Sequence, residues 1–326
     1  MTNMQAEARQ RATRRQALCG LVAGVGAGLA GLRSARAQEM VLPFASSSQA
    51  DAPPINGVYD WHALPPTPTG LEQDNGDQMM DSGMVPGQGR AQIYYCSAGQ
   101  GAPVVLLHDS LANSDYVSGL ARALLRARCR VVVIDMRGHG RSTMGSLPLS
   151  YDLLADDVVT VLAYLRIRKA AFVGWGDGAV QALNIAMRHP GMVAKLFAFA
   201  PHTTPDGLKA AGRADDSALK AFEARAKQEY RHLSSTPRGF SDLQDAVDEM
   251  HRYAPTWTDA DLVRITAPLW VVVADRDQLV DRAQCEHLAA TVEGAGLMML
   301  PNVSHFAPLQ NPLLFALATE SFLGGR

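Results

Sequence analysis

The sequence contains little cysteine, with only four residues among 326. Cys19 lies in an N-terminal segment that we expect to be removed, which leaves Cys96, Cys129 and Cys285. Three cysteines are too few for a framework of disulfides, and their spacing matches no metal site. The sequence therefore excludes a disulfide-stabilised scaffold, and we expect these thiols to be buried and free.

A strong excess of positive charge is also absent, because the whole chain has a net charge of −2. Residues 1–37 hold six arginines and one acidic residue, so the remainder has 24 basic against 31 acidic residues, a net charge of −7. An acidic body repels phosphate backbones, which argues against nucleic-acid binding. Hydrophobic residues make up 47% of the chain, enough for a large core, which excludes a disordered or fibrous protein.

No apolar run reaches the roughly 18 residues that a transmembrane helix needs. The run at residues 18–32 is shorter and rich in glycine, follows the pair Arg14-Arg15, and precedes a small-residue cleavage site at 35–37. This order predicts an export signal over residues 1–37, of the twin-arginine type, with a general secretory signal or an amphipathic helix as alternatives. We therefore expect a periplasmic protein without a membrane anchor after the signal is removed.

Residues 38–80 are rich in Pro, Gly, Ser, Asn and Gln without an apolar period, which predicts an irregular leader or linker. Beyond them, residues 83–95 have the pattern of a hairpin around Gly87-Gln88-Gly89, and short apolar runs then alternate with helical patterns. The runs are PVVLLH (103–108), RVVVID (130–135), AAFVG (170–174), KLFAFA (195–200), PLWVVVAD (268–275) and LMML (297–300). Their Val, Ile and Leu content suits strands buried on both faces, so the sequence predicts an α/β fold with a mostly parallel, eight-stranded sheet.

Strand patterns stop between residues 202 and 264. Two stretches there, SALKAFEARAKQEYRHL and FSDLQDAVDEMHRY, have helical spacing. We expect a helical lid inserted after the sixth strand, with residues 81–201 and 265–326 as the core. The large side chains of this stretch either line an apolar pocket or hold the insertion to the core: Phe222, Tyr230, Phe240, Met250, Tyr253 and Trp257.

Ligands of such sheets bind beyond the carboxyl ends of the strands. The strand at 170–174 leads through Gly174-Trp175-Gly176-Asp177-Gly178 into a helical pattern. A sharp strand-turn-helix with this glycine spacing is typical of a nucleophile elbow, whose central residue is a serine in the GxSxG motif. Here the central residue is Gly176, which adopts strained dihedrals easily but offers no oxygen for attack. The sequence thus predicts an empty position where an alcohol would stand.

Two further residues follow strand ends in the order of a hydrolase triad: Asp277 after the run at 268–275, and His305 after the run at 297–300. With this order, residues 82–323 resemble the α/β-hydrolase superfamily, in the branch of esterases, C–C hydrolases and haloperoxidase-like enzymes. Two more segments match. His108-Asp109 resembles the His-Gly of that family, and DMRGHGRS (135–142) resembles its DxRGxGxS turn.

The resemblance implies a role for each matching residue. It implies that Asp277 is the acid and His305 the base of the triad, with Asp275 as the alternative acid. The backbone N–H groups of Ser110 and Asp177 would form the oxyanion hole. A histidine oriented by a carboxylate can take a proton from a hydroxyl group or from water and return it later.

The chain departs from the family at two positions, Gly176 and Asp109, which stands where a glycine is usual. A carboxylate beside the oxyanion hole would oppose the developing negative charge. Asp177 and Ser110 are weak candidates for a nucleophile that would replace the missing serine. We therefore expect weak or impaired hydrolysis of esters or similar bonds in a small, partly apolar substrate, without metal or cofactor. A ligand-binding pseudoenzyme, or a variant inactivated at Gly176, remains an alternative, and the sequence gives no indication of oligomeric state.

Overall fold

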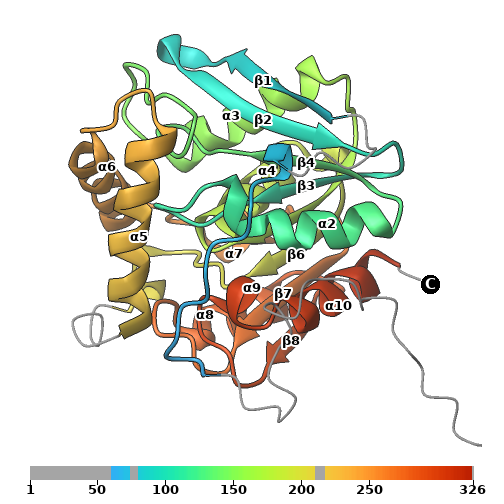
Figure 1. Ribbon diagram of the computed structural model, residues 1–326. Coiled ribbons are helices and arrows are strands. Elements are labelled where there is room, and N and C mark those ends of the chain that lie inside the picture. The colour runs from blue at the N-terminus through green and yellow to red at the C-terminus, as the bar shows by residue number, and fades with distance from the viewer. Residues whose placement is uncertain (1–59, 74–79, 210–216, 325–326) are drawn as a thin grey trace, which may run out of the picture. The chain divides into compact units, whose positions relative to one another are not determined.

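The computed structural model describes residues 60–73, 80–209 and 217–324 (Figure 1). Its centre is an eight-stranded sheet with the order β1-β2-β4-β3-β5-β6-β7-β8, in which the strands from β4 to β8 along the sheet run parallel. The strands are β1 (Met80–Pro86), β2 (Gln92–Ala98), β3 (Pro103–Leu107), β4 (Arg130–Ile134), β5 (Ala170–Trp175), β6 (Val193–Phe199), β7 (Leu269–Ala274) and β8 (Gly296–Leu300). The predicted α/β fold is confirmed, and each predicted apolar run forms one strand.

The apolar content of the central strands explains why they lie in the middle of the sheet. In β3, the side chains of Val105, Leu106 and Leu107 are fully buried because helices cover both faces. The edge strand β1 instead has a mostly exposed or half-exposed pattern and pairs antiparallel with β2, as expected for a hairpin. The hairpin turns through η2 (Gln88–Arg90), where the sequence predicted a turn around three residues.

Helices cover both faces of the sheet (Figure 1). Two helices, α2 (Ser118–Arg126) and α10 (Pro312–Leu323), pack against each other on one face. On the opposite face, α3 (Tyr151–Tyr164) packs on α4 (Asp177–Arg188), and α8 (Arg282–Thr291) contacts β7 and β8. None of the helices in the described ranges is long and apolar enough to cross a membrane, and the predicted export signal lies outside those ranges.

In the described part of the chain, three α-helices lie between β6 and β7: α5 (Ser217–Leu233), α6 (Phe240–Tyr253) and α7 (Asp259–Leu262). We call α5 and α6 the helical insertion. Most of its buried side chains form a second apolar cluster with side chains of α3 and α4, and this cluster includes Tyr230, Phe240 and Met250. The predicted helical stretch is therefore present, while its role as a lid stays a prediction.

Residues 60–73 form what we call the N-terminal strap, which ends in η1 (Leu71–Gln73). Backbone carbonyls of the strap accept hydrogen bonds from side chains on three helices. The donors are Gln310 at the end of α9 (Ala307–Gln310), Arg225 of α5 and Arg122 of α2. Figure 1 shows the strap running alongside α5 toward α2. This part of the predicted linker therefore connects the helical insertion with the core.

Candidate active site

The turn between β5 and α4 has the geometry of a nucleophile elbow. Gly176 lies between the last residue of β5 and the first of α4 with φ 55° and ψ −120°, a conformation that glycine adopts without steric cost. Its N–H donates to the carbonyl of Phe199 (2.9 Å), and its own carbonyl accepts from Ala179 N–H (2.9 Å), so both ends of the turn are fixed. The sharp turn predicted from the glycine spacing is present.

His305 lies in the loop after β8 and is oriented by Asp277, which follows β7. Its Nδ1 is 3.0 Å from Asp277 Oδ2 and 3.2 Å from Oδ1. Asp277 Oδ1 also accepts two backbone N–H groups from the loop that follows, each at 2.9 Å. The alternative acid, Asp275, instead accepts from Val303 N–H at 3.2 Å. Of the two candidate acids, the geometry therefore pairs Asp277 with His305.

The position facing His305 is filled by the carboxylate of Asp109, which follows β3. Asp109 Oδ2 lies 3.0 Å from His305 Nε2, and Oδ1 accepts the backbone N–H of Asp177 at 2.8 Å. A Cβ atom built on Gly176 would overlap this carboxylate. The prediction of an empty position was therefore wrong. The sequence placed Asp109 beside the site but did not indicate that its side chain points into the nucleophile's place.

The positive charge of this cluster lies on His305, whose side chain is only 2% exposed. Although burial lowers its pKa, the carboxylates of Asp277 and Asp109 raise the pKa of His305 to about 10. Burial alone would raise the pKa of Asp277, but His305 and the two backbone N–H groups hold the pKa of this carboxyl group below its usual value. At neutral pH, His305 is therefore an imidazolium between two carboxylates and not yet a base.

His108 fixes the backbone next to the carboxylate. Its Nε2 accepts the backbone N–H of Met136 at 2.9 Å, so its Nδ1 carries the proton and donates to the carbonyl of Asp109 at 2.7 Å. Burial lowers the pKa of His108, which keeps the ring neutral. This histidine therefore positions the loop after β3.

A second charged cluster surrounds the side chain of Asp177, and the sequence analysis missed it. His251 Nε2, from α6, lies 2.8 Å from Asp177 Oδ2, and Tyr151 OH donates to Asp177 Oδ1 at 2.7 Å. Burial opposes ionisation, but His251, His202 and Tyr151 lower the pKa of Asp177. Asp177 thus turns its N–H toward Asp109 and its carboxylate toward His251, which disfavours Asp177 as a nucleophile.

Asp109 lines a cavity of about 150 Å³ between the loop after β3 and the helical insertion. The other lining residues are Ser110, Leu111, Leu219, Phe222, Glu223, Gln244, Val247, Asp248, His251 and Leu279. Among the large side chains predicted for the lid, Phe222 belongs to this lining, while Tyr253 is exposed. The role of the Ser110 N–H as an oxyanion donor stays a prediction.

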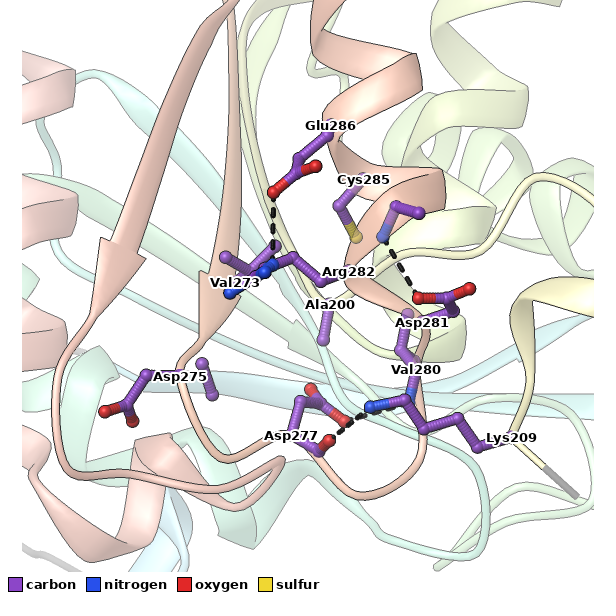
Figure 2. Close-up of a pocket in the computed structure, with 12 residues that line it drawn as sticks. Ala200, Lys209, Val273, Asp275, Asp277, Val280, Asp281, Arg282, Cys285 and Glu286 are labelled. Atoms are coloured by element: carbon purple, nitrogen blue, oxygen red, sulfur yellow. Dashed lines mark hydrogen bonds and ion pairs between the residues drawn. The ribbon is translucent and has the colours of Figure 1, made fainter. Parts of the chain in front are cut away.

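A larger cavity of about 290 Å³ lies beside Asp277, between the end of β7 and α8 (Figure 2). Figure 2 shows charged side chains of both signs around it, and Lys209 Nζ donates to the backbone carbonyl of Asp277 at 2.8 Å. Within the described ranges, no group of three His, Cys, Asp or Glu side chains is arranged to hold a metal ion.

The sheet order, the elbow and the placement of His305 and Asp277 agree with a comparison against protein families. Residues 104–318 match the model of the alpha/beta hydrolase family. The chain belongs to this family. Within it, the chain is similar to the non-heme haloperoxidase of Rhodococcus erythropolis, with 27% identity over 246 residues that cover 66% of this chain and 89% of the relative.

Two further proteins resemble the chain. The pimeloyl-[acyl-carrier protein] methyl ester esterase of Nitrosospira multiformis is 25% identical, over 69% of this chain and 95% of that protein. The solved structure of the N-acyl homoserine lactone degrading enzyme Est816 is 28% identical and superposes with a TM-score of 0.60, over 74% of this chain and all of Est816. The two alignments thus include nearly all of each relative and 69–74% of this chain.

Proposed function

We propose that this protein hydrolyses an ester or a similar bond in a small, partly apolar substrate bound in the 150 Å³ cavity. His305, oriented by Asp277, first loses its own proton and then takes a proton from the attacking water. The family supports this proposal, and so do two relatives whose names describe cleavage of a methyl ester and degradation of a lactone.

The observation that carries the proposal is the placement of His305 between two carboxylates at the carboxyl ends of the strands. Asp277 fixes the ring from one side, and the other ring nitrogen faces the cavity-lining Asp109. A protein that only bound a ligand would have no need of a buried acid-base pair behind a cavity-lining carboxylate. We expect turnover to be slow, since Gly176 offers no alcohol and His305 begins protonated.

Hydrolysis of methyl butyrate, followed by titration of the acid released, tests the proposal. The parent chain should release butyrate faster than the uncatalysed reaction, and His305→Gln should reduce the rate on the order of 10³-fold, because general acid-base catalysis by a positioned side chain contributes about 10²–10⁴-fold. Glu249→Gln, an exposed change on α6, serves as a control that should leave the rate unchanged. Equal rates for the parent and His305→Gln would contradict the proposal.

A pseudoenzyme that holds a small ligand is the second candidate. The binding function is supported by the contacts of Asp109, whose carboxylate accepts the Asp177 N–H and also pairs with His305. Both groups are therefore already engaged, which blocks entry of a substrate carbonyl. Native mass spectrometry of the purified protein distinguishes the two functions. An unmodified, stoichiometric ligand without hydrolysis favours the binding function. The overlap between Asp109 and a side chain at Gly176 also disfavours the view that Gly176 is a single inactivating change.

We also propose that the protein is exported through its N-terminal segment, on the basis of the arginine pair, the apolar run and the small-residue cleavage site. Fractionation of cells that express the full chain tests this proposal. The mature protein should appear in the periplasm, and replacing both Arg14 and Arg15 by Lys should retain it in the cytoplasm. Export of the double-lysine variant at the parent level would contradict the twin-arginine route.

A further inference from the structure

We infer that Asp109 is the nucleophile of this site, and that its carboxylate attacks a saturated carbon that carries a leaving group. This inference rests on the proposed hydrolase function but moves the point of attack from a carbonyl carbon to a saturated carbon. The chain would then accept a small alkyl compound whose carbon–leaving-group bond is broken by an incoming oxygen. The alcohol missing from Gly176 would be replaced by a carboxylate from a neighbouring loop.

Three features of the placement of Asp109 support this role. Its carboxylate fills the space in front of Gly176, faces His305 Nε2 at 3.0 Å, and lines the cavity where a substrate would bind. The carboxylate is held in this place, because one oxygen accepts the Asp177 N–H and the backbone carbonyl of Asp109 accepts from His108. A carboxylate has about four lone-pair directions. The hydrogen bonds from the Asp177 N–H and from His305 use two of them, which leaves lone pairs free to attack a substrate.

The same contacts explain why a saturated carbon suits the site better than a carbonyl carbon. A substrate carbonyl would need the Asp177 N–H for its oxyanion, but Asp109 Oδ1 already accepts that N–H. Attack by Asp109 Oδ2 on a saturated carbon needs no oxyanion donor. During this attack Oδ1 keeps its hydrogen bond from the Asp177 N–H, and this N–H then stabilises the oxyanion of the following step.

The two steps balance in atoms, protons and electrons. In the first, a bond forms between Asp109 Oδ2 and the substrate carbon, while the bond to the leaving group breaks and its electron pair departs with that group. Because the negative charge of Asp109 is then gone, His305 releases its proton to solvent. The net products of this step are the leaving-group anion and one proton. The enzyme now carries an alkyl ester on Asp109.

In the second step, neutral His305 takes a proton from water, and the hydroxide adds to the Asp109 carboxyl carbon. The oxyanion on Oδ1 is held by the Asp177 N–H. The adduct then collapses and breaks the bond between the carboxyl carbon and Oδ2. The departing alkoxide takes the hydroxyl proton of the adduct, which regenerates the Asp109 carboxylate beside the His305 imidazolium. The alcohol product carries an oxygen from Asp109, and Asp109 keeps one from water.

The cavity limits the size of the substrate. A volume of about 150 Å³ is that of a known protein cavity that accepts benzene, so about six non-hydrogen atoms fit. Several lining side chains, such as Leu111, Phe222 and Val247, are apolar and suit a short alkyl chain. A four-carbon alkyl halide, 1-bromobutane, therefore fits the cavity and carries a leaving group that needs no proton to depart.

Isotope labelling with the full chain tests the inference. The parent protein is incubated with excess 1-bromobutane in ¹⁸O-water, and the peptides are then analysed by mass spectrometry. We expect bromide release and ¹⁸O in the peptide that contains Asp109. In His305→Gln, which lacks the base for the second step, we expect a stable butyl ester on Asp109. Asp248, another carboxylate of the cavity lining, is the internal control and should stay unlabelled and unalkylated.

Each outcome bears on the inference. Bromide release with ¹⁸O in butanol but none in the Asp109 peptide would overturn it, because water would then attack the substrate directly. Neither bromide release nor an adduct would overturn it as well. Methyl butyrate, assayed in parallel, reports on the proposed function. Hydrolysis of this ester without label in Asp109 would leave a hydrolase whose nucleophile is water.

Discussion

The carboxylate of Asp109 stands where a side chain on Gly176 would project, so these two residues form one matched pair. In the sequence they look like two separate departures from the alpha/beta hydrolase family. In the structure, each depends on the other. The carboxylate fits only because residue 176 has no side chain, and the missing side chain leaves no gap because the carboxylate fills it.

A serine at position 176 should therefore not restore a serine hydrolase by itself. Gly176→Ser would collide with Asp109, and forcing extra atoms into a packed site costs about 1–3 kcal/mol of stability. The double variant Gly176→Ser with Asp109→Gly removes the collision, frees the Asp177 N–H and lets the new hydroxyl face His305. We expect the double variant to react with a fluorophosphonate probe. Asp109→Gly alone should not react, and equally fast labelling of the single serine variant would contradict the pairing.

Removing the charge of Asp109 should change the titration of His305. Because two carboxylates hold the pKa of His305 at about 10, Asp109→Asn should lower this pKa while Asp277 keeps the ring in place. NMR titration of the His305 ring protons measures the shift. Asp248→Asn, on the same cavity but without contact to the ring, is the matched control and should leave the pKa of His305 near 10. An unchanged pKa in Asp109→Asn would contradict the ion pair.

Stability should fall at alkaline pH. The pKa of folded His305 is raised from 6.5 to about 10, so the imidazolium contributes stability that is fully present below pH 6.5 and lost as the pH rises through 10. Urea unfolding of the parent between pH 7 and 10 should show a loss of a few kcal/mol. The loss should be smaller in His305→Gln, which has no such proton to release. Parallel pH profiles for the two proteins would contradict this account.

Breaking the buried ion pair between Arg137 of the DxRGxGxS turn and Asp157 of α3 should destabilise the protein strongly. Arg137 binds Asp157 through two hydrogen bonds of 2.6 and 2.7 Å, and both side chains are almost fully buried. Asp157→Ala leaves an unpaired buried guanidinium, so the free energy of unfolding should fall by about 3–5 kcal/mol. Glu249→Ala breaks an exposed pair with Arg252 and should cost at most about 0.5 kcal/mol. Urea unfolding measures both, and similar losses would contradict the role of burial.

The strands and the elbow were predictable because their signals are local. A strand such as β3 needs only a run of apolar, partly β-branched residues, and the elbow needs glycines at fixed offsets. The order of Gly176, Asp277 and His305 along the chain then indicated which strand ends meet. These features depend on neighbours in the sequence or on the topology of a parallel sheet, and both can be read without coordinates.

The direction of individual side chains was not predictable. Asp109 was recognised as unusual, but whether its carboxylate points away from the elbow depends on the packing of three loops that are distant in sequence. His251 lies in a helical pattern without a motif, so nothing marked its contact with Asp177. The N-terminal strap was missed for another reason, because it is held largely through backbone carbonyls, which have no sequence signature.

That strap has a practical meaning for anyone who shortens the protein. A recombinant chain that starts at β1 would keep every strand of the sheet, yet it would deprive Arg225, Gln310 and Arg122 of carbonyl groups that they now bind. Helix α5 would lose the hydrogen bonds that Arg225 now donates to the strap. Affinity tags and trimmed starts therefore belong upstream of residue 60.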